Sequence, residues 1–222
     1  GHPIRVFFAC ARRGAGLAAH EARTVASVGP GGFRGLTDDE LFAVMVTLGD
    51  VSRGGDAMLI EATAEVQRRE TNTEPFHRVH GCASVNELLQ RTTGMSGATA
   101  KKFITAAEAV QGVVSLHGEL LSAPFPAVAE AMFAGRLGLD GVLAATRDLS
   151  EVRHRVDPAA FDRMERVMVD VISTSLSLDG FAPMADDVRR FARETATRLD
   201  QDGPKPVETE ARRGRYVRLG RM

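Results

Sequence analysis

The sequence predicts an all-α fold of about seven or eight helices, arranged as antiparallel hairpins and followed by a short C-terminal extended segment. Two observations carry this prediction. Apolar residues recur every three or four positions over most of the chain, which is the spacing of one helix face. The 222 residues include eleven Phe, one Tyr and no Trp, so the core is mainly aliphatic. That composition suits packed helices better than a β-sandwich.

The longest predicted helix begins at Thr37 and spans some thirty positions. Thr37 and Glu40 have the spacing of a capping box, in which each side chain binds the backbone amide of the other residue. Gly49, Gly54 and Gly55 lie inside the pattern and each costs about 1 kcal/mol relative to Ala. The helix therefore either bends there or breaks into two. Its apolar residues with helical spacing are Leu41, Val44, Met45, Leu48, Val51, Met58, Leu59, Ala62 and Val66.

Two units with a short helix, a glycine turn and a longer helix follow. The first has a capping box at Ser84, a turn at Gly94 and a second cap at Ser96. The second places helices at 128–133 and 139–149 on either side of a glycine-containing turn. Their similarity suggests a duplicated αα-hairpin. The longer helix of the first unit has one apolar stripe: Ala100, Phe103, Ala107, Val110 and Val114.

The last predicted helices lie before residue 200. Asp157 followed by Pro158 is a helix start, with Asp as the cap and Pro at the first helical position. The final helix ends near Leu199, and an alternating polar and apolar pattern at 212–221 resembles an edge strand. The stripe predicted for the helix after Pro158 is Phe161, Met164, Met168 and Val171.

These elements predict a division of the chain into four parts. Residues 1–2 are interpreted as a tag remnant, and residues 3–35 as an N-terminal segment that can be helical. A helical domain follows at 36–200, and then a linker and basic extended tail at 201–222. A single strand is not stable alone, so the chain is expected to be cut before a missing C-terminal module.

Composition limits the compartment and the partners. The 28 Lys and Arg residues nearly balance the 29 Asp and Glu residues, so the net charge does not indicate binding to nucleic acid or to a membrane. Two cysteines fit a reducing compartment, and no apolar run reaches about 18 residues, the minimum for a membrane span. A cytoplasmic location without membrane contact is expected. The 25 arginines are scattered, which favours coding bias over a recognition site.

His77, His80 and Cys82 form the one cluster with metal-ligating side chains. Together they could present three ligands to zinc, with a fourth from Cys10 or His20. No second ligand pair stands at zinc-finger spacing, which favours a polar loop that binds nothing. Phosphate-loop, nucleophile-elbow and zinc-protease motifs are absent from the sequence. We therefore expect no catalytic residue, cofactor or small-molecule substrate in this chain.

Two segments could contact DNA. The unit at 84–110 resembles a helix-turn-helix with Lys101 and Lys102 on its second helix, although a plain αα-hairpin fits the same pattern. The tail from 204 to 222 has six Lys or Arg and two Glu, a local net charge of +4. It could grip phosphates or be a solvated strand edge. The candidate residues in the tail are Arg212, Arg213, Arg215 and Arg218.

Several motifs together resemble an actinobacterial domain of unknown function that precedes HNH nuclease modules, the 13E12 repeat family. The resemblance covers roughly residues 36–222 and rests on the order and spacing of the motifs, since no single motif is diagnostic. They are Leu36–Leu41, Ala64–Arg69, Gly81–Leu89, Thr93–Ser96 with Ala100, Ala131–Leu137, Leu199–Pro204 and Arg212–Arg215.

The resemblance implies a helical domain followed, in the parent protein, by a ββα-metal nuclease module that binds one divalent ion. No catalytic or metal residue can be carried over, since the motifs found here precede that module. The leading hypothesis is a non-catalytic N-terminal domain of an HNH-endonuclease-like protein that helps to engage or position DNA. The alternative is a protein-interaction or homo-oligomerisation module without nucleic-acid contact. The third hypothesis is a metalloenzyme that uses His77, His80 and Cys82.

Overall fold

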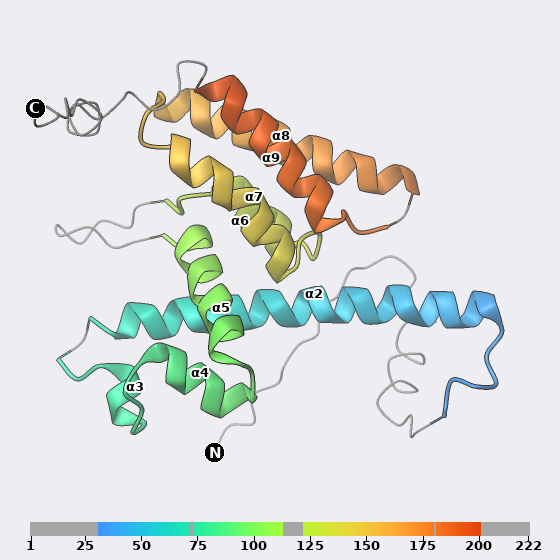
Figure 1. Ribbon diagram of the computed structural model, residues 1–222, viewed down its shortest axis with the longest axis horizontal. Coiled ribbons are helices and arrows are strands. Elements are labelled where there is room, and N and C mark those ends of the chain that lie inside the picture. Colours follow the sequence, from blue (N-terminus) through green and yellow to red (C-terminus); the bar gives the residue numbers. More distant parts are fainter. Residues whose placement is uncertain (1–30, 72, 113–121, 180, 201–222) are drawn as a thin grey trace, which may run out of the picture.

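The computed structural model describes residues 31–71, 73–112, 122–179 and 181–200. Every regular element in these ranges is a helix, which confirms the all-α prediction (Figure 1). The predicted N-terminal segment before residue 31 and the predicted extended tail at 201–222 lie outside the described residues. The helices are α2 (Asp38–Arg69), α3 (Phe76–Val79), α4 (Val85–Thr93), α5 (Gly97–Val110), α6 (Pro126–Phe133), α7 (Leu139–Val152), α8 (Pro158–Asp179) and α9 (Ala185–Leu199).

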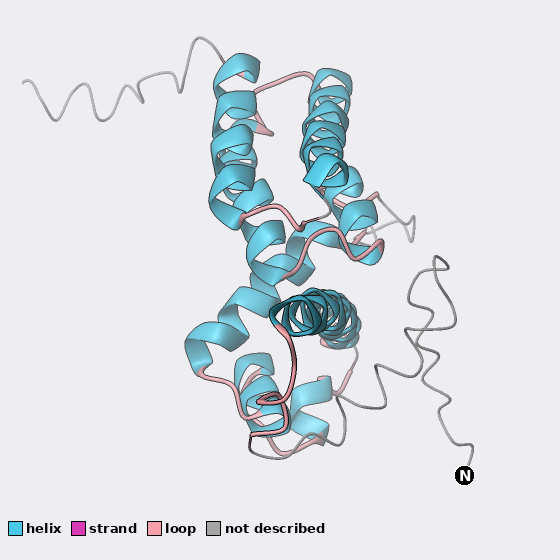
Figure 2. Ribbon diagram, turned by 90° about the vertical axis from the view of Figure 1, so that its right-hand side faces the viewer, coloured by secondary structure: helices cyan, strands magenta, loops and turns pink. Residues whose placement is uncertain are grey.

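The long helix α2 runs between two groups of helices. Seen nearly along its axis, α3 and α4 lie on one side of α2 and the helices α6 to α9 on the other (Figure 2). Helix α5 crosses α2 and joins the two groups, because it packs against α2, α4, α6 and α7. Helices α7 and α9 form the most extensive pair, and α8 packs against α9 and α6.

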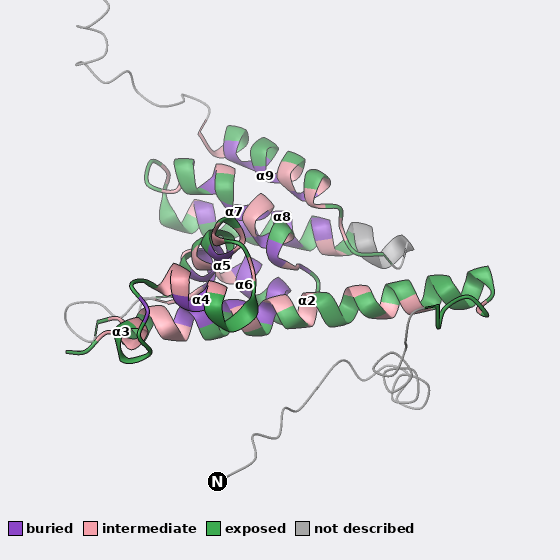
Figure 3. Cartoon of the chain, turned by 60° about the horizontal axis from the view of Figure 1, so that its bottom comes forward, coloured by how far each residue is buried: buried purple, intermediate pink, exposed green. Residues whose placement is uncertain are grey.

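Helix α2 is a single helix through all three of its glycines. Its capping box forms as predicted, with the Glu40 amide donating to Thr37 Oγ1 at 3.3 Å and the Thr37 amide donating to Glu40 Oε2 at 2.8 Å. No residue from 38 to 56 is buried, whereas four residues from 57 onward are. Figure 3 shows this exposed half extending past the other helices.

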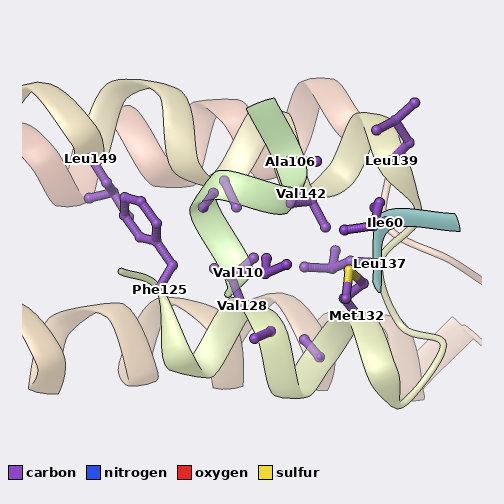
Figure 4. Packing of buried hydrophobic residues seen from close by; sticks show 14 of the residues in the cluster. Ile60, Ala106, Val110, Phe125, Val128, Met132, Leu137, Leu139, Val142 and Leu149 are labelled. Carbon is purple, nitrogen blue, oxygen red and sulfur yellow. The ribbon is translucent and has the colours of Figure 1, made fainter. Parts of the chain in front are cut away.

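The apolar stripe predicted for α2 is not its buried face. Leu41, Leu48, Val51 and Met58 are all exposed. The buried side is formed instead by Ala57, Ile60, Thr63 and Ala64. Three of these four side chains are small, which lets α5 come close to α2, while Ile60 fills the core between the helices. Around Ile60 the core contains Met132, Leu137 and Leu139 (Figure 4).

Both helix–glycine–helix units form as predicted. Gly94 caps α4 with φ of 74°, and Gly135 follows α6 with φ of 72°, a conformation that favours glycine. The Ser84 and Ser96 side chains accept the predicted amides at the starts of α4 and α5. The capping box at Ser84 is only half formed, because the Glu87 carboxylate accepts the Ala83 amide instead. Val114 of the predicted stripe lies outside the described residues.

Helix α8 begins as predicted, with the Asp157 carboxylate accepting the Ala160 amide at 2.9 Å. Its predicted stripe is partly wrong, since Phe161 and Met168 are buried but Val171 is exposed. The buried face passes instead through an acid, Glu165. Among the α8 residues whose burial is described, those buried on this face are Phe161, Glu165, Met168, Val169 and Ile172.

Glu165 caps a neighbouring helix. Its Oε1 accepts the Val128 amide at 3.0 Å, in the first turn of α6, where the N-cap Phe125 supplies no side-chain acceptor. Only 1% of Glu165 is exposed. Burial raises the pKa of its carboxyl to about 7, because the protein interior solvates the charged form poorly. A titratable group therefore joins α8 to α6 inside the core.

Candidate interaction groove

An open groove runs along the exposed half of α2. It has a volume of about 490 Å³ and continues the side of α2 that enters the core farther along the helix. The turn after α6 and the segment between α8 and α9 form its other walls. Its lining residues include Phe42, Met45, Val46, Arg53, Gly135, Arg136 and Phe181.

Two aromatic rings form one edge of this groove. Phe42 of α2 meets Phe181, which follows α8, with ring centroids 5.7 Å apart and planes at 76°. Edge-to-face contact of this kind is a favourable geometry for aromatic pairs. Yet each of the two residues keeps 52% of its surface exposed, and Met45 beside them keeps 65%. The pair fixes the wall of the groove without filling it.

Arg53 and Asp56 of α2 fix the opposite wall. Arg53 Nε donates to the Gly135 carbonyl at 2.9 Å, and its guanidinium also pairs with Asp50. Asp56 Oδ2 accepts the Leu139 amide at 2.9 Å and so caps α7. The N-cap of α7 is Gly138, where a Cβ would lie 2.9 Å from the Asp56 oxygen. A larger residue at this position would have to displace the Asp56 carboxylate from the cap.

The groove is lined mainly by apolar side chains. Three charged residues, Asp50, Arg53 and Arg136, also line it, and Arg53 and Asp50 pair with each other. The titratable core group Glu165 does not line it. An open apolar surface with few polar groups can accept an apolar segment of another polypeptide, whereas general acid–base chemistry requires a positioned proton donor or acceptor.

The structure places the two lysines of the helix-turn-helix-like unit at the start of α5. Both are exposed, and Lys102 Nζ pairs with Asp140 of α7 at 3.1 Å. The rest of α5 is a central core helix, which leaves little of it free to enter a DNA groove. Its buried residues are Ala100, Phe103, Ala106, Ala107, Ala109 and Val110. The candidate tail residues Arg212, Arg213, Arg215 and Arg218 lie outside the described residues.

The three residues of the metal candidate make separate contacts. The His77 ring pairs with Glu70 through Nδ1, and the Glu70 carboxylate also accepts the His77 amide. The His80 ring packs on Phe76 with centroids 4.5 Å apart. Cys82 is buried, with Sγ 3.7 Å from the His80 carbonyl oxygen. Within the described ranges, no group of three or more His, Cys, Asp or Glu could hold a metal ion.

Sequence reasoning missed the residues that form the groove. Phe42 does not belong to the predicted stripe, and Phe181 stands alone after a glycine. Arg53 and Asp56 lie three residues apart on α2, a spacing that surface ion pairs also use. One available signal was the pair of apolar positions next to the predicted stripe, Phe42 and Val46, since a helix with apolar residues on more than one side needs more than one neighbour.

The comparison with protein families gives one result. A model of the family described as Domain of unknown function (DUF222) matches residues 55–222. The chain belongs to this family. The DUF222 match begins inside α2, so the groove residues Phe42 and Met45 precede it while Arg53 lies at its edge. No curated protein and no solved structure matches the chain. None of the described helices is long and apolar enough to cross a membrane.

Proposed function

We propose that this DUF222 domain is a non-catalytic interaction module that binds an apolar segment of another polypeptide in the α2 groove. The observation that supports it is the exposed cluster of Phe42, Met45 and Phe181 around a groove of about 490 Å³. Large apolar side chains that remain half exposed beside a concavity mark binding surfaces more often than ordinary surface.

The groove indicates the chemistry of its partner. One wall is a helix with exposed apolar side chains, so an amphipathic helix laid along α2 can place one or two aliphatic or aromatic anchors between Phe42 and Phe181. Arg136 is exposed at the rim and suits a carboxylate beside the anchors. The proposed partner is therefore an apolar helical segment with an acidic flank.

The sequence resemblance gives the proposal a setting. The domain would act in a cytoplasmic parent protein that carries an HNH nuclease module, and the divalent ion and the cutting chemistry would belong to that module. Its own contribution would be to hold another polypeptide, since the groove offers an apolar binding surface. This setting rests on the resemblance between motifs, which is an argument by analogy.

A peptide selection tests the proposal. Helical peptides with apolar anchors and acidic flanks are selected on the full chain, and their affinities are measured for two matched variants. Phe42→Glu places a charge in the groove, whereas Val167→Glu places one on α8 at a residue of similar exposure, 52% against 54%. We expect at least about a tenfold loss for the first variant only. Equal losses in both variants, or no selected peptide, would refute the proposal.

DNA engagement is the second candidate, and the exposed pair Lys101 and Lys102 beside a tail of net charge +4 favours it. Phosphate contacts make binding weaken steeply with salt. A salt titration with duplex and single-stranded DNA would compare the chain with Lys101→Ala/Lys102→Ala and Arg212→Ala/Arg213→Ala/Arg215→Ala variants. A salt-dependent affinity that falls in both variants would support this function, and no binding at low salt would exclude it.

A further inference from the structure

A second apolar surface on α2 faces away from the groove. We call its seven positions the outer seam. They follow one another by alternating steps of three and four residues, the spacing by which helices of a coiled coil meet. Four of them are large side chains exposed by 37% or more of their surface. The outer seam consists of Leu41, Val44, Leu48, Val51, Gly55, Met58 and Ala62.

Nothing in the described structure packs closely over the middle of the outer seam. An added Cβ at Gly54 or Gly55 would meet no atom within 4 Å. Met58 keeps 55% and Val51 49% of its surface exposed. A helix with apolar residues on two opposite sides is typical of a helix buried between two neighbours. Along the exposed half of α2, the described residues offer such a neighbour on the groove side only. The outer seam therefore lacks a covering segment.

We propose that the chain's own residues 4–25 form a helix that packs antiparallel along the outer seam. Of the thirteen apolar residues in this N-terminal segment, seven are separated by alternating steps of four and three residues. Read in reverse, these steps become three and four, the order found in the outer seam. The seven positions are Ile4, Phe8, Ala11, Ala15, Ala18, Ala22 and Val25.

Both sets span 22 residues, so an antiparallel pair brings every position of one set opposite a position of the other. Four of the seven pairs also join a small side chain to a larger one. Ala15, Ala18 and Ala22 lie opposite larger residues of α2, and Ile4 lies opposite Ala62. The opposing pairs are Val25 and Leu41, Ala22 and Val44, Ala18 and Leu48, Ala15 and Val51, Ala11 and Gly55, Phe8 and Met58, and Ile4 and Ala62.

Charge favours this occupant over a second copy of the chain. Residues 4–25 carry four Arg and one Glu, a net charge of +3, whereas residues 38–56 carry five acids and one Arg, a net charge of −4. The two segments attract each other. Two copies of α2 would instead bring together two segments that each carry a net charge of −4, which weakens their association.

The connection between the two segments also favours an intramolecular contact. Only residues 26–40 separate them, and residues 31–35 form a turn directly before α2, where Gly31 has φ of 84°. So short a tether gives the segment a high effective concentration at the outer seam. Gly14 and Gly16 would weaken an isolated helix. The helix should therefore depend on its contact with α2.

Disulfide formation in the full chain tests this arrangement. In a Cys10→Ser background, Ala15→Cys with Val51→Cys places two thiols at opposing apolar positions. The matched control, Arg13→Cys with Val51→Cys, moves the first thiol to the outward side of the proposed helix at nearly the same chain reach. Under mild oxidation we expect the first pair to close within one molecule more than about tenfold faster than the control. Equal rates, or links between two molecules, would overturn the proposal.

A second measurement does not depend on introduced cysteines. Phe8→Glu puts a charge at an apolar position of the proposed contact, and Ala9→Glu puts the same charge on its outward side. We expect faster amide hydrogen exchange across residues 41–58 in Phe8→Glu and unchanged exchange in Ala9→Glu. The same exchange in both variants would overturn the proposal. Because the outer seam and the groove lie on opposite sides of α2, either result leaves the groove hypothesis to its own test.

Discussion

The two halves of α2 belong to one unbroken helix but differ in what surrounds them. From residue 57 onward one side of the helix enters the core and buries Ala57, Ile60, Thr63 and Ala64. From residue 38 to 56 no side chain is buried, although this half is rich in large apolar residues. Apolar content is therefore similar on both halves, and the difference lies in the neighbours.

This contrast teaches where the stability of the helix originates. Helix formation is cooperative, so the half anchored in the core can nucleate the half that extends beyond it. The capping box at Thr37 then closes the free end. The core half is expected to determine global stability, whereas the exposed half is expected to determine what the domain can bind.

The largest expected effect is a difference in the free energy of unfolding between substitutions in the two halves of α2. Ile60→Ala removes a fully buried side chain from the core, and we expect it to lower the free energy of unfolding by roughly 2–5 kcal/mol. Met45→Ala, in the exposed half, should change it by less than about 0.5 kcal/mol. Urea denaturation followed by circular dichroism measures both. A comparable loss in Met45→Ala would mean that the exposed half already has a tightly packed neighbour.

The next largest expected effect is a pH dependence of stability that originates in the core. Folding raises the pKa of Glu165 from 4.5 to about 7, so the folded state binds more protons between these values. The stabilisation from this proton is complete below pH 4.5 and is lost as pH rises through 7. The loss should approach roughly 3 kcal/mol above pH 7. Arg153 and Asp162 act on the same carboxyl in opposite directions.

Glu165→Gln should remove this component of the pH dependence, since the amide keeps an acceptor for the Val128 amide and does not titrate. Denaturation curves at several pH values from 5 to 8 compare the variant with the unchanged chain. The rate of amide hydrogen exchange in the core half of α2 should show the same difference in pH dependence between the variant and the unchanged chain. The exchange rate in residues 41–52 should not. An unchanged pH slope in Glu165→Gln would show that another group is responsible.

The smallest expected effect is a local loss of stability at the N-terminal end of α2. Thr37→Ala removes both hydrogen bonds that its hydroxyl makes with Glu40, a loss of about 1 kcal/mol for a typical N-cap. Because the cap lies far from the core, we expect faster amide exchange over residues 38–45 and little change in the midpoint of denaturation. A shift of the midpoint as large as the local effect would mean that the halves unfold together.

Local signals predicted most of the helical elements. Helix caps and glycine turns depend on residues that are close together in the sequence, so the starts and ends of helices could be predicted from local patterns. The caps are Thr37, Ser84, Ser96 and Asp157, and the turns are at 94 and 135. Which side of a helix enters the core depends on residues far away in the chain. The predicted stripe on α2 is the exposed one for that reason, and on α8 the apolar pattern could not indicate that the acid Glu165 would be buried.

The groove could not be predicted, because its walls come from three separate parts of the sequence. Phe42 and Phe181 meet only through the tertiary arrangement, and neither belongs to a motif. The residues that sequence reasoning did select gave a mixed result. His77 and Cys82 have other contacts, Lys102 pairs with Asp140, and the tail arginines lie outside the described residues, so their role in DNA binding stays a prediction.

The two hydrogen bonds by which α2 holds the turn after α6 join residues 82 and 83 positions apart, Arg53 with Gly135 and Asp56 with Leu139. On the ribosome, α2 is complete long before that turn has been synthesised. During this interval the groove has only one wall, and Phe42 and Met45 face solvent without their partners. A nascent chain exposes such apolar surface at the risk of aggregation. Early arrival of a covering segment would therefore protect the domain while it is being made.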